Sequence, residues 1–195
     1  MHGLINRSIQ SFVTDTYGVA AWDSVAQRAD LGFDGFEALL VYEDAVTQSV
    51  LAALVVELDR PLDGVLEDIG HYMVSHTHYE ALRRLLRFGG VTFVDFLFSL
   101  DDLPDRTRLA VPDLSLPNIE VSDLGNGCFR LTCDATFEGF GHVMLGVLRA
   151  MADDYGDLVF LEHAGTKDGA EVVEVTLLET QFAEGRSFAL SAEAG

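Results

Sequence analysis

Three histidines with acidic neighbours form the densest group of metal-ligating residue types in this chain. His71, His76 and His78 are followed by Glu80, and Asp68 precedes His71 by one helical turn. A divalent-metal site needs three or four converging nitrogen or oxygen donors at about 2 Å. The segment around His76 and His78 is typical of a turn, where helical spacing does not fix convergence. Surface histidines are therefore the favoured interpretation, and a metal site is the alternative.

A cluster of carboxylates, Asp101, Asp102 and Asp105, has the residue type for general acid–base catalysis. Pro104 stands inside this cluster, and proline disrupts a helix interior, so the pattern favours carboxylates that cap or solvate a broken helix end. The chain contains no glycine-rich phosphate loop, no Gly-x-Ser-x-Gly and no His-Glu-x-x-His motif. We therefore expect a non-enzymatic protein, since no residue set for a reaction is evident.

Cys128 and Cys133 are the only cysteines, and they lie five positions apart in a strand-like segment. Side chains alternate between the two faces of a strand, so an odd spacing predicts thiols on opposite faces. The two cysteines should not bond to each other within that strand. Two buried free thiols are consistent with a reducing cytoplasm.

The elements that must position these residues begin with a helical half. Over residues 3–17 the apolar residues recur at three- and four-residue steps, a pattern typical of a helix with one buried face. Comparable stripes predict a helix around Trp22 and further helices over residues 42–59, 62–73, 79–88 and 91–103.

A connector between Pro112 and Pro117 marks a change of architecture, because neither proline tolerates a helix interior. Two hairpins and one helix are then predicted: strands 118–122 and 128–134, helix 139–155, and strands 158–163 and 170–178. This order predicts an α+β fold. We expect a helical N-terminal subdomain at 1–112, an α+β C-terminal subdomain at 113–185 and a flexible tail at 186–195, forming one compact domain overall.

Several short motifs occur in a characteristic order along nearly the whole chain. They are Met1-His2-Gly3-Leu4-Ile5-Asn6, Tyr17-Gly18 followed by Trp22, Gly70-His71-Tyr72, Gly89-Gly90, Leu100-Asp101, Pro112, Pro117, and Gly146-Val147-Leu148. In this order and spacing they resemble the haem nitric-oxide/oxygen-binding (H-NOX) family. The resemblance implies a helical half packed on a C-terminal four-stranded antiparallel sheet with one inserted helix, and haem between the halves.

The family holds its iron through a proximal histidine in a Leu-Asp-x-x-His pattern, since imidazole supplies the axial bond. The matching segment here is Leu100-Asp101-Asp102-Leu103-Pro104. Proline has no donor atom for iron, and inside a helix it also removes a hydrogen bond and kinks the backbone. The family's proximal bond is therefore not expected in this chain.

The family's Tyr-x-Ser-x-Arg motif, which binds the haem propionates, is also replaced. Cys133, Ala135 and Phe137 stand at the three motif positions. Charge-assisted contacts of this kind contribute about 1.5 to 3 kcal/mol each, so their combined loss removes about 4 to 8 kcal/mol. That loss corresponds to about three to six powers of ten in affinity, so we expect no cofactor bound in the family manner.

One residue favours haem nonetheless. His142 matches a position where some family members place a polar residue of the distal pocket, so it is the candidate iron ligand if haem is bound. The alternative is a solvent-facing or hydrogen-bonded ring near a helix N-terminus. The resemblance implies a ligand pocket that either closes or accepts an uncharged apolar ligand, lined by Ile5, Ile9, Pro104, Pro117, Cys133, Ala135, Phe137 and His142.

Composition restricts the partners. The chain has 195 residues, with 32 acidic and 12 basic residues and a formal charge of −20, which repels phosphate backbones and anionic lipid. The longest apolar run, residues 50–56, is far shorter than the roughly 20 residues that span a bilayer. We therefore expect neither nucleic acid nor membrane as a partner, and the N-terminus lacks a secretory pattern, which indicates a cytoplasmic protein.

These observations favour a non-enzymatic sensory or binding module of the H-NOX fold that does not bind haem in the family manner. The resemblance further implies a signalling partner, such as a histidine kinase or a cyclic-dinucleotide enzyme, with a basic surface that complements this acidic chain. The alternative is a haem-binding nitric-oxide sensor that uses a different axial ligand, with His142 as the first candidate.

Overall fold

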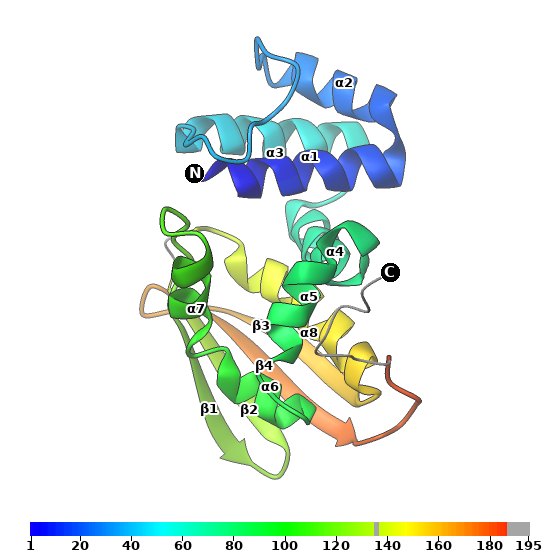
Figure 1. Ribbon diagram of the computed structural model, residues 1–195, viewed down its shortest axis with the longest axis vertical. Helices are drawn as coiled ribbons and strands as arrows, with labels where there is room; N and C mark the ends of the chain where they lie inside the picture. Colours follow the sequence, from blue (N-terminus) through cyan, green and yellow to red (C-terminus); the bar gives the residue numbers. More distant parts are fainter. Residues whose placement is uncertain (135–136, 187–195) are drawn as a thin grey trace, which may run out of the picture. The chain divides into compact units, whose positions relative to one another are not determined.

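The computed structural model of the protein describes residues 1–134 and 137–186 (Figure 1). The chain forms two compact units, Met1–Ile69 and Gly70–Gly195. The division falls inside helix α4 (Leu62–Ser75). Each unit has its own set of buried residues and is described by itself.

The first unit consists of helices α1 (Gly3–Tyr17), α2 (Val19–Arg28) and α3 (Asp44–Leu58), followed by the first turns of α4. The side chain of His2 caps α1 by accepting a hydrogen bond from the Leu4 N–H at 3.2 Å, as polar residues at this position commonly do. The helices bury one apolar face each, with Ile9, Phe12, Val13, Trp22, Val25, Val50, Leu51 and Leu54 among the residues inside.

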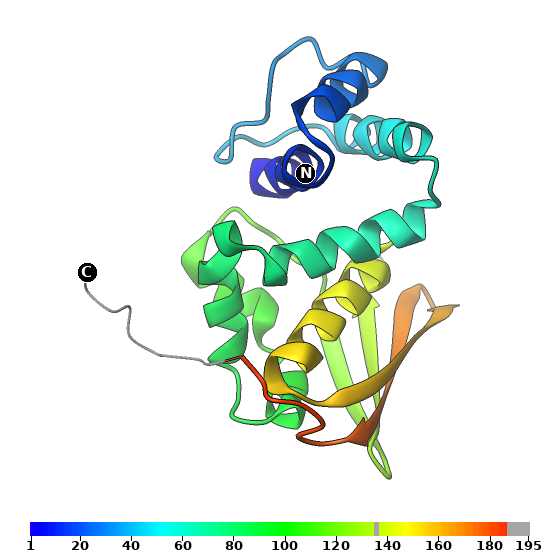
Figure 2. The same ribbon diagram turned by 90° about the vertical axis from the view of Figure 1, so that its right-hand side faces the viewer.

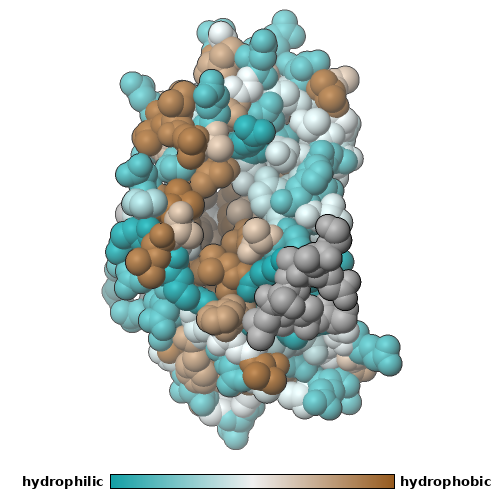
Figure 3. All heavy atoms as spheres, viewed as in Figure 1, coloured by the Kyte–Doolittle hydropathy of each residue, from teal (hydrophilic) through white to brown (hydrophobic). Residues whose placement is uncertain are grey.

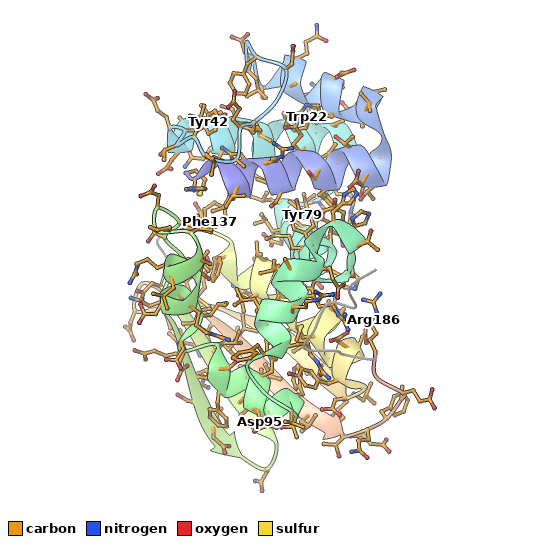
Figure 4. All side chains as sticks on the ribbon, in the orientation of Figure 1. Trp22, Tyr42, Tyr79, Asp95, Phe137 and Arg186 are labelled. Atoms are coloured by element: carbon orange, nitrogen blue, oxygen red, sulfur yellow. The ribbon has the colours of Figure 1, made fainter. Side chains whose placement is uncertain are left out.

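Aromatic rings hold the long loop between α2 and α3 onto this unit. Phe36 packs edge-on against both Trp22 and Tyr42, at ring-centroid distances of 6.1 and 4.9 Å (Figure 4). Beneath the loop, the hydroxyl of Thr47 donates a buried hydrogen bond of 2.8 Å to the side-chain oxygen of Asn6. The Asn of the opening motif therefore has a structural role, since it links α1 to α3.

The second unit places helices on one face of an antiparallel sheet (Figures 1 and 2). The helices are α5 (Glu80–Arg87), α6 (Phe93–Ser99), α7 (Leu103–Ala110) and α8 (Phe140–Tyr155), with a short 3-10 turn at Thr77–Tyr79. The strands are β1 (Ile119–Gly125), β2 (Cys128–Asp134), β3 (Leu158–Lys167) and β4 (Ala170–Glu179). Their order across the sheet is β1-β2-β4-β3. The two edges of the sheet are therefore β1 and β3.

The core of the second unit lies between the sheet and α8. Every second residue of β2 and β4 faces it, including Phe129, Leu131, Val173 and Val175, as the two-residue period of a strand requires. Helix α4 approaches α8 closely at Gly70, where a Cβ atom would lie 2.0 Å from the backbone oxygen of Val143. A residue with a side chain would force the two helices apart, which explains the glycine in the Gly70-His71-Tyr72 motif.

The predicted α+β order of helices and hairpins is confirmed, but the prediction of one helix over residues 91–103 is wrong. Residues 91–103 were expected to form one helix that ends before Pro104, but α6 ends at Ser99 and α7 begins at Leu103. Proline is tolerated in the first turn of a helix, so the chain starts a new helix around Pro104 instead of bending an old one.

The sequence analysis also predicted a subdomain boundary and a flexible tail. The boundary at residue 112 divides the chain by type of secondary structure and stays a prediction, whereas the compact units divide after Ile69. The expected flexible tail at 186–195 lies outside the described residues, except for Arg186.

Hydrophilic and neutral residues cover most of the face drawn in Figure 3, with apolar residues in separate groups. This distribution agrees with the 23% of charged residues in the sequence. Among the described residues, no helix combines the length and the apolar character needed to cross a bilayer.

Candidate functional site

Pro104, which the sequence analysis expects at the proximal-ligand position, lies buried in the first turn of α7. The turn before it is closed by the Leu103 N–H, which donates to the Leu100 carbonyl at 3.0 Å. The carboxylate of Asp101 accepts a hydrogen bond of 2.8 Å from the Val121 N–H and ties the same turn to β1. The backbone of the Leu-Asp-x-x pattern is thus well held, while its last residue offers no atom that could bind a metal.

Cys133, which the sequence analysis expects at the first position of the family's propionate motif, lies near the end of β2. Its side chain is fully buried in the core, and it pairs across the sheet with Glu171 of β4. Burial raises the pKa of the Cys133 thiol to about 12, with further contributions from the negative charges of Glu171 and Asp134. This end of the sheet is therefore both apolar and anionic, which disfavours a ligand with two carboxylates.

The other two motif positions lie in the connection between β2 and α8. Ala135 is outside the described residues. Phe137 is half-buried, packs against the core of the second unit, and accepts a hydrogen bond from the Phe140 N–H at its carbonyl (3.2 Å; Figure 4). The equivalence of this ring with the family's guanidinium stays a prediction.

Glu171 joins the N-terminal end of α8 to the sheet, a role that the sequence analysis missed. The residue is 5% exposed. One carboxylate oxygen accepts the Gly139 N–H at 2.7 Å, and the other accepts the Gly141 N–H at 2.9 Å. A carboxylate at this place is stabilised by the positive end of the helix dipole. The signal in the sequence was strand parity, since Glu171 alternates with the core residues Val173 and Val175.

His163 of β3 completes this group. Its Nε2 atom lies 3.0 Å from the second carboxylate oxygen of Glu171, and its side chain is 16% exposed. Gly141 makes the approach feasible, because a Cβ atom there would lie 2.7 Å from the Glu171 carboxylate and 2.8 Å from His163 Nε2. We call Glu171, His163 and the Gly139 and Gly141 N–H groups the helix-end anchor.

His142, the candidate iron ligand, lies in the first turn of α8 next to this helix-end anchor. Its ring stacks on the ring of His163, with centroids 4.1 Å apart and an angle of 20° between the planes. Cys133, Phe137 and His142 therefore gather at one end of α8. A role for His142 in binding iron stays a prediction.

The remaining residues of the predicted pocket are distributed between the two units. Ile5 is half-buried and Ile9 fully buried in α1 of the first unit, whereas Pro104 and Pro117 are buried in the second. A common pocket formed by these residues stays a prediction.

The histidines that opened the sequence analysis have partners within the second unit. His71 Nδ1 lies 3.3 Å from the Ser75 hydroxyl. The ring of His76 stacks on Tyr72 at 4.7 Å, and its Nδ1 accepts the His78 N–H at 3.4 Å. These contacts stabilise the end of α4 and the turn that follows.

Solved structures share this fold. The Fe(II) unliganded H-NOX protein from K. algicida has a TM-score of 0.80 and 15% sequence identity, covering 94% of this chain and 100% of that chain. An H-NOX protein from S. oneidensis in the Fe(II)NO ligation state has a TM-score of 0.77 and 16% identity, covering 92% of this chain and 100% of that one. The expected H-NOX architecture is thus confirmed.

Curated relatives are longer than this chain. Soluble guanylate cyclase 89Db of Drosophila melanogaster is 21% identical over 155 residues, which are 80% of this chain but 23% of that protein. Soluble guanylate cyclase gcy-31 of Caenorhabditis elegans is 23% identical over 154 residues, 79% of this chain and 22% of that protein. The chain thus spans about a quarter of these relatives or less. The profile of the Haem-NO-binding family matches residues 2–163, and on this match the chain belongs to that family.

Proposed function

We propose that this chain is a non-enzymatic sensory module of the Haem-NO-binding family that does not hold haem through the family contacts. The observation that carries the proposal is Pro104, buried in the first turn of α7 at the position of the axial ligand. A pyrrolidine ring has no free electron pair for iron, so the strongest bond between the family and its cofactor cannot form here.

The anchoring end is equally unsuited to haem. A haem propionate placed beside Cys133 would meet the buried carboxylate of Glu171 and the charge of Asp134. Like charges in a poorly solvated place repel strongly. The Glu171 carboxylate already accepts hydrogen bonds from the Gly139 and Gly141 N–H groups at the start of α8, so those donors are not available to a second anion.

The residues at the propionate positions also indicate the kind of ligand. The propionate positions now carry a neutral thiol and the ring of Phe137, so the ligand that fits best is small, uncharged and apolar. The change of state would pass to a signalling partner, by analogy with the family. The guanylate cyclase relatives combine a matching region with much more chain, which supports a role in signalling.

A haem titration tests the proposal. Wild-type protein mixed with one equivalent of haem should give no sharp Soret band beyond that of free haem. Pro104→His restores the axial donor and should give a measurable band. A variant that also carries Cys133→Tyr, Ala135→Ser and Phe137→Arg should bind more tightly than Pro104→His alone.

The competing function is a haem-based nitric-oxide sensor with His142 as the axial ligand, favoured by the place of His142 in the first turn of α8. A stoichiometric Soret band in the wild-type protein that disappears in His142→Ala would establish this function and refute the proposal. His78→Ala is the matched control, because His78 is exposed and its loss should leave any haem band unchanged.

A further inference from the structure

The two edges of the sheet differ in how their backbone groups are covered. On the β1 edge, the Val121 N–H donates to the Asp101 carboxylate at 2.8 Å, so a side chain from the α6–α7 turn covers part of that edge. Natural proteins commonly protect edge strands in this way, because unpaired N–H and C=O groups invite pairing with another chain.

The β3 edge instead borders a groove of about 270 Å³ between β3 and the second half of α8. The strand contributes residues 158–161 to this groove, and α8 contributes Arg149, Ala152 and Asp153. The pairing of β3 with β4 is regular from Val159 to His163 and is interrupted by a bulge on either side. Five consecutive residues of β3 are therefore regularly paired on one side, and among the described residues no strand pairs with their other side.

Apolar side chains next to this edge are exposed. Phe160 and Leu158 of β3 are 57% and 38% exposed, and Leu178 of the neighbouring β4 is 60% exposed. Phe160 alternates with Val159 and Leu161, which pack against the core, and therefore lies on the sheet face opposite the helices. No described helix covers that face (Figure 2). Exposed apolar residues beside an edge strand that no described strand pairs with are the features that strand-adding partners use.

The charges around the groove determine the kind of partner. Asp153 and Asp157 line it, and Glu162 and Glu179 are exposed on the adjoining strands. The groove also contains one cation, Arg149, so negative charges predominate. A second copy of this chain would bring another formal charge of −20 and be repelled.

We propose that the free edge of β3 is a docking site for an extended, basic segment of a partner protein, which adds a fifth strand to the sheet. This inference rests on the proposed role as a module that signals through a partner, and it names the surface and the chemistry of that contact. Backbone hydrogen bonds would fix the added strand, apolar side chains would cover Phe160, and basic side chains would face Asp153 and Asp157.

The contact would be weak. Five residues of regular strand bury far less surface than the roughly 1,600 Å² of a stable complex, so we expect a dissociation constant on the order of 10 to 100 µM. An affinity of this size suits a transient signalling contact.

The test uses the full chain and a blocked nine-residue peptide that alternates lysine and valine. Two control peptides separate the sources of affinity: one replaces lysine by glutamate, and one carries N-methyl groups on alternate residues, which removes strand hydrogen bonds but keeps the charge. Binding is measured by fluorescence anisotropy at moderate salt, and NMR amide exchange identifies the strand that becomes protected. We expect the lysine–valine peptide alone to bind and to protect amides of residues 159–163.

Two matched charge reversals locate the site. Asp153→Lys, in the groove, should weaken peptide binding about five- to tenfold through repulsion of the basic strand. Glu120→Lys makes the same charge change on the exposed face of β1 and should alter binding less than about twofold. Equal effects of the two variants would mean that only the overall charge matters, which would overturn the proposal.

Two further results would also overturn it. Equal binding of the N-methylated peptide would exclude strand addition, and a dimer in analytical ultracentrifugation that Phe160→Lys dissociates would identify a second copy as the occupant. The haem titration reports on Pro104, His142 and the three propionate-motif positions, none of which lines the groove. A failed docking test therefore leaves its outcome unaffected, and a haem-binding wild-type protein leaves the docking test valid.

Discussion

Helix α8 has a buried carboxylate at each end, and the two carboxylates are neutralised in different ways. At the N-terminal end, Glu171 accepts hydrogen bonds from two backbone N–H groups and lies beside His163. At the C-terminal end, Asp154 is 1% exposed and accepts two hydrogen bonds from the guanidinium of Arg83, at 2.6 and 2.9 Å. Arg87 Nε lies 3.5 Å from the second oxygen of Asp154. One carboxylate is thus neutralised by backbone dipoles and an imidazole ring, and the other by two permanent cations.

The surroundings of the two ends differ as well. The C-terminal end holds together several segments of the second unit: the guanidinium of Arg87 lies 3.7 Å from the centre of the Tyr155 ring, and the Tyr155 hydroxyl donates to the Gly90 carbonyl. The backbone N–H of Arg186 donates to the Asp154 carbonyl, beside the end of the helix (Figure 4). The N-terminal end instead adjoins Cys133, where the family motif has changed. Both ends of α8 are therefore anchored, but only the N-terminal end adjoins the positions where this chain is expected to differ from the family motif.

The largest effect should come from breaking the C-terminal pair. Arg83→Met leaves the Asp154 charge buried without its main partner, which should lower the free energy of unfolding by about 3 to 5 kcal/mol. Urea unfolding followed by circular dichroism measures this loss. Arg84→Met is the control, since Arg84 is exposed on the same helix and pairs with Glu80 at 3.5 Å, a contact that contributes at most about 1 kcal/mol.

A second variant sharpens this result. Arg83→Met combined with Asp154→Leu removes both charges and should recover part of the lost stability, because the cost lies in a buried carboxylate that keeps only Arg87, 3.5 Å away, as a cationic partner. A loss in Arg83→Met no larger than that in Arg84→Met would show that the C-terminal end is not an anchor.

A smaller effect is expected at the N-terminal end. Glu171→Gln retains one acceptor but points an amide N–H group at the Gly139 or Gly141 donor, so we expect a loss of about 1 to 3 kcal/mol in the free energy of unfolding. Glu174→Gln is the matched control, because Glu174 lies on the same strand with 40% of its side chain exposed, in an ion pair with Arg130. Equal losses in both variants would contradict a buried helix-end anchor.

Elements with an uninterrupted apolar period could be predicted from the sequence. The helix of residues 3–17 and the strand of residues 128–134 were predicted with the bounds of α1 and β2, because their apolar residues follow the helix and strand periods without interruption. The position of the helix break before Pro104 was predicted wrongly, because a proline next to an apolar pattern can either end one helix or lie in the first turn of another. Leu100 and Leu103 are both buried, so the apolar pattern continues across the break and does not mark it.

The candidate site was predicted where it depends on residue type and missed where it depends on packing. Pro104 and Phe137 could be placed by their motif positions alone. Glu171 could be placed on the core face by strand parity, but its partner Gly139 lies 32 positions away in the sequence. No local sequence pattern indicates which helix end will lie next to a given strand residue. The helix-end anchor can therefore be recognised only in the tertiary structure.

The smallest effect is a pH dependence that reports on each end separately. The pKa of the Cys133 thiol is raised from 9.0 to about 12 by burial, so above about pH 9 the unfolded chain releases a proton that the folded chain retains. Stability is therefore fully present below pH 9 and is lost as the pH rises, by up to about 1.4 kcal/mol per pH unit. Burial also raises the pKa of Tyr155 at the C-terminal end, although Arg87 opposes the shift.

Unfolding free energies measured at about pH 8 and about pH 10 separate these two contributions. Cys133→Ala should reduce the alkaline loss by roughly 1.4 kcal/mol. Tyr155→Phe should reduce the loss less than Cys133→Ala, because the nearby guanidinium favours the ionised phenol. If Cys133→Ala retained the full wild-type loss, the thiol would ionise freely in the folded chain. The N-terminal end of α8 would then be solvated enough to accept the charged groups of a haem, and the proposed function would lose its electrostatic support.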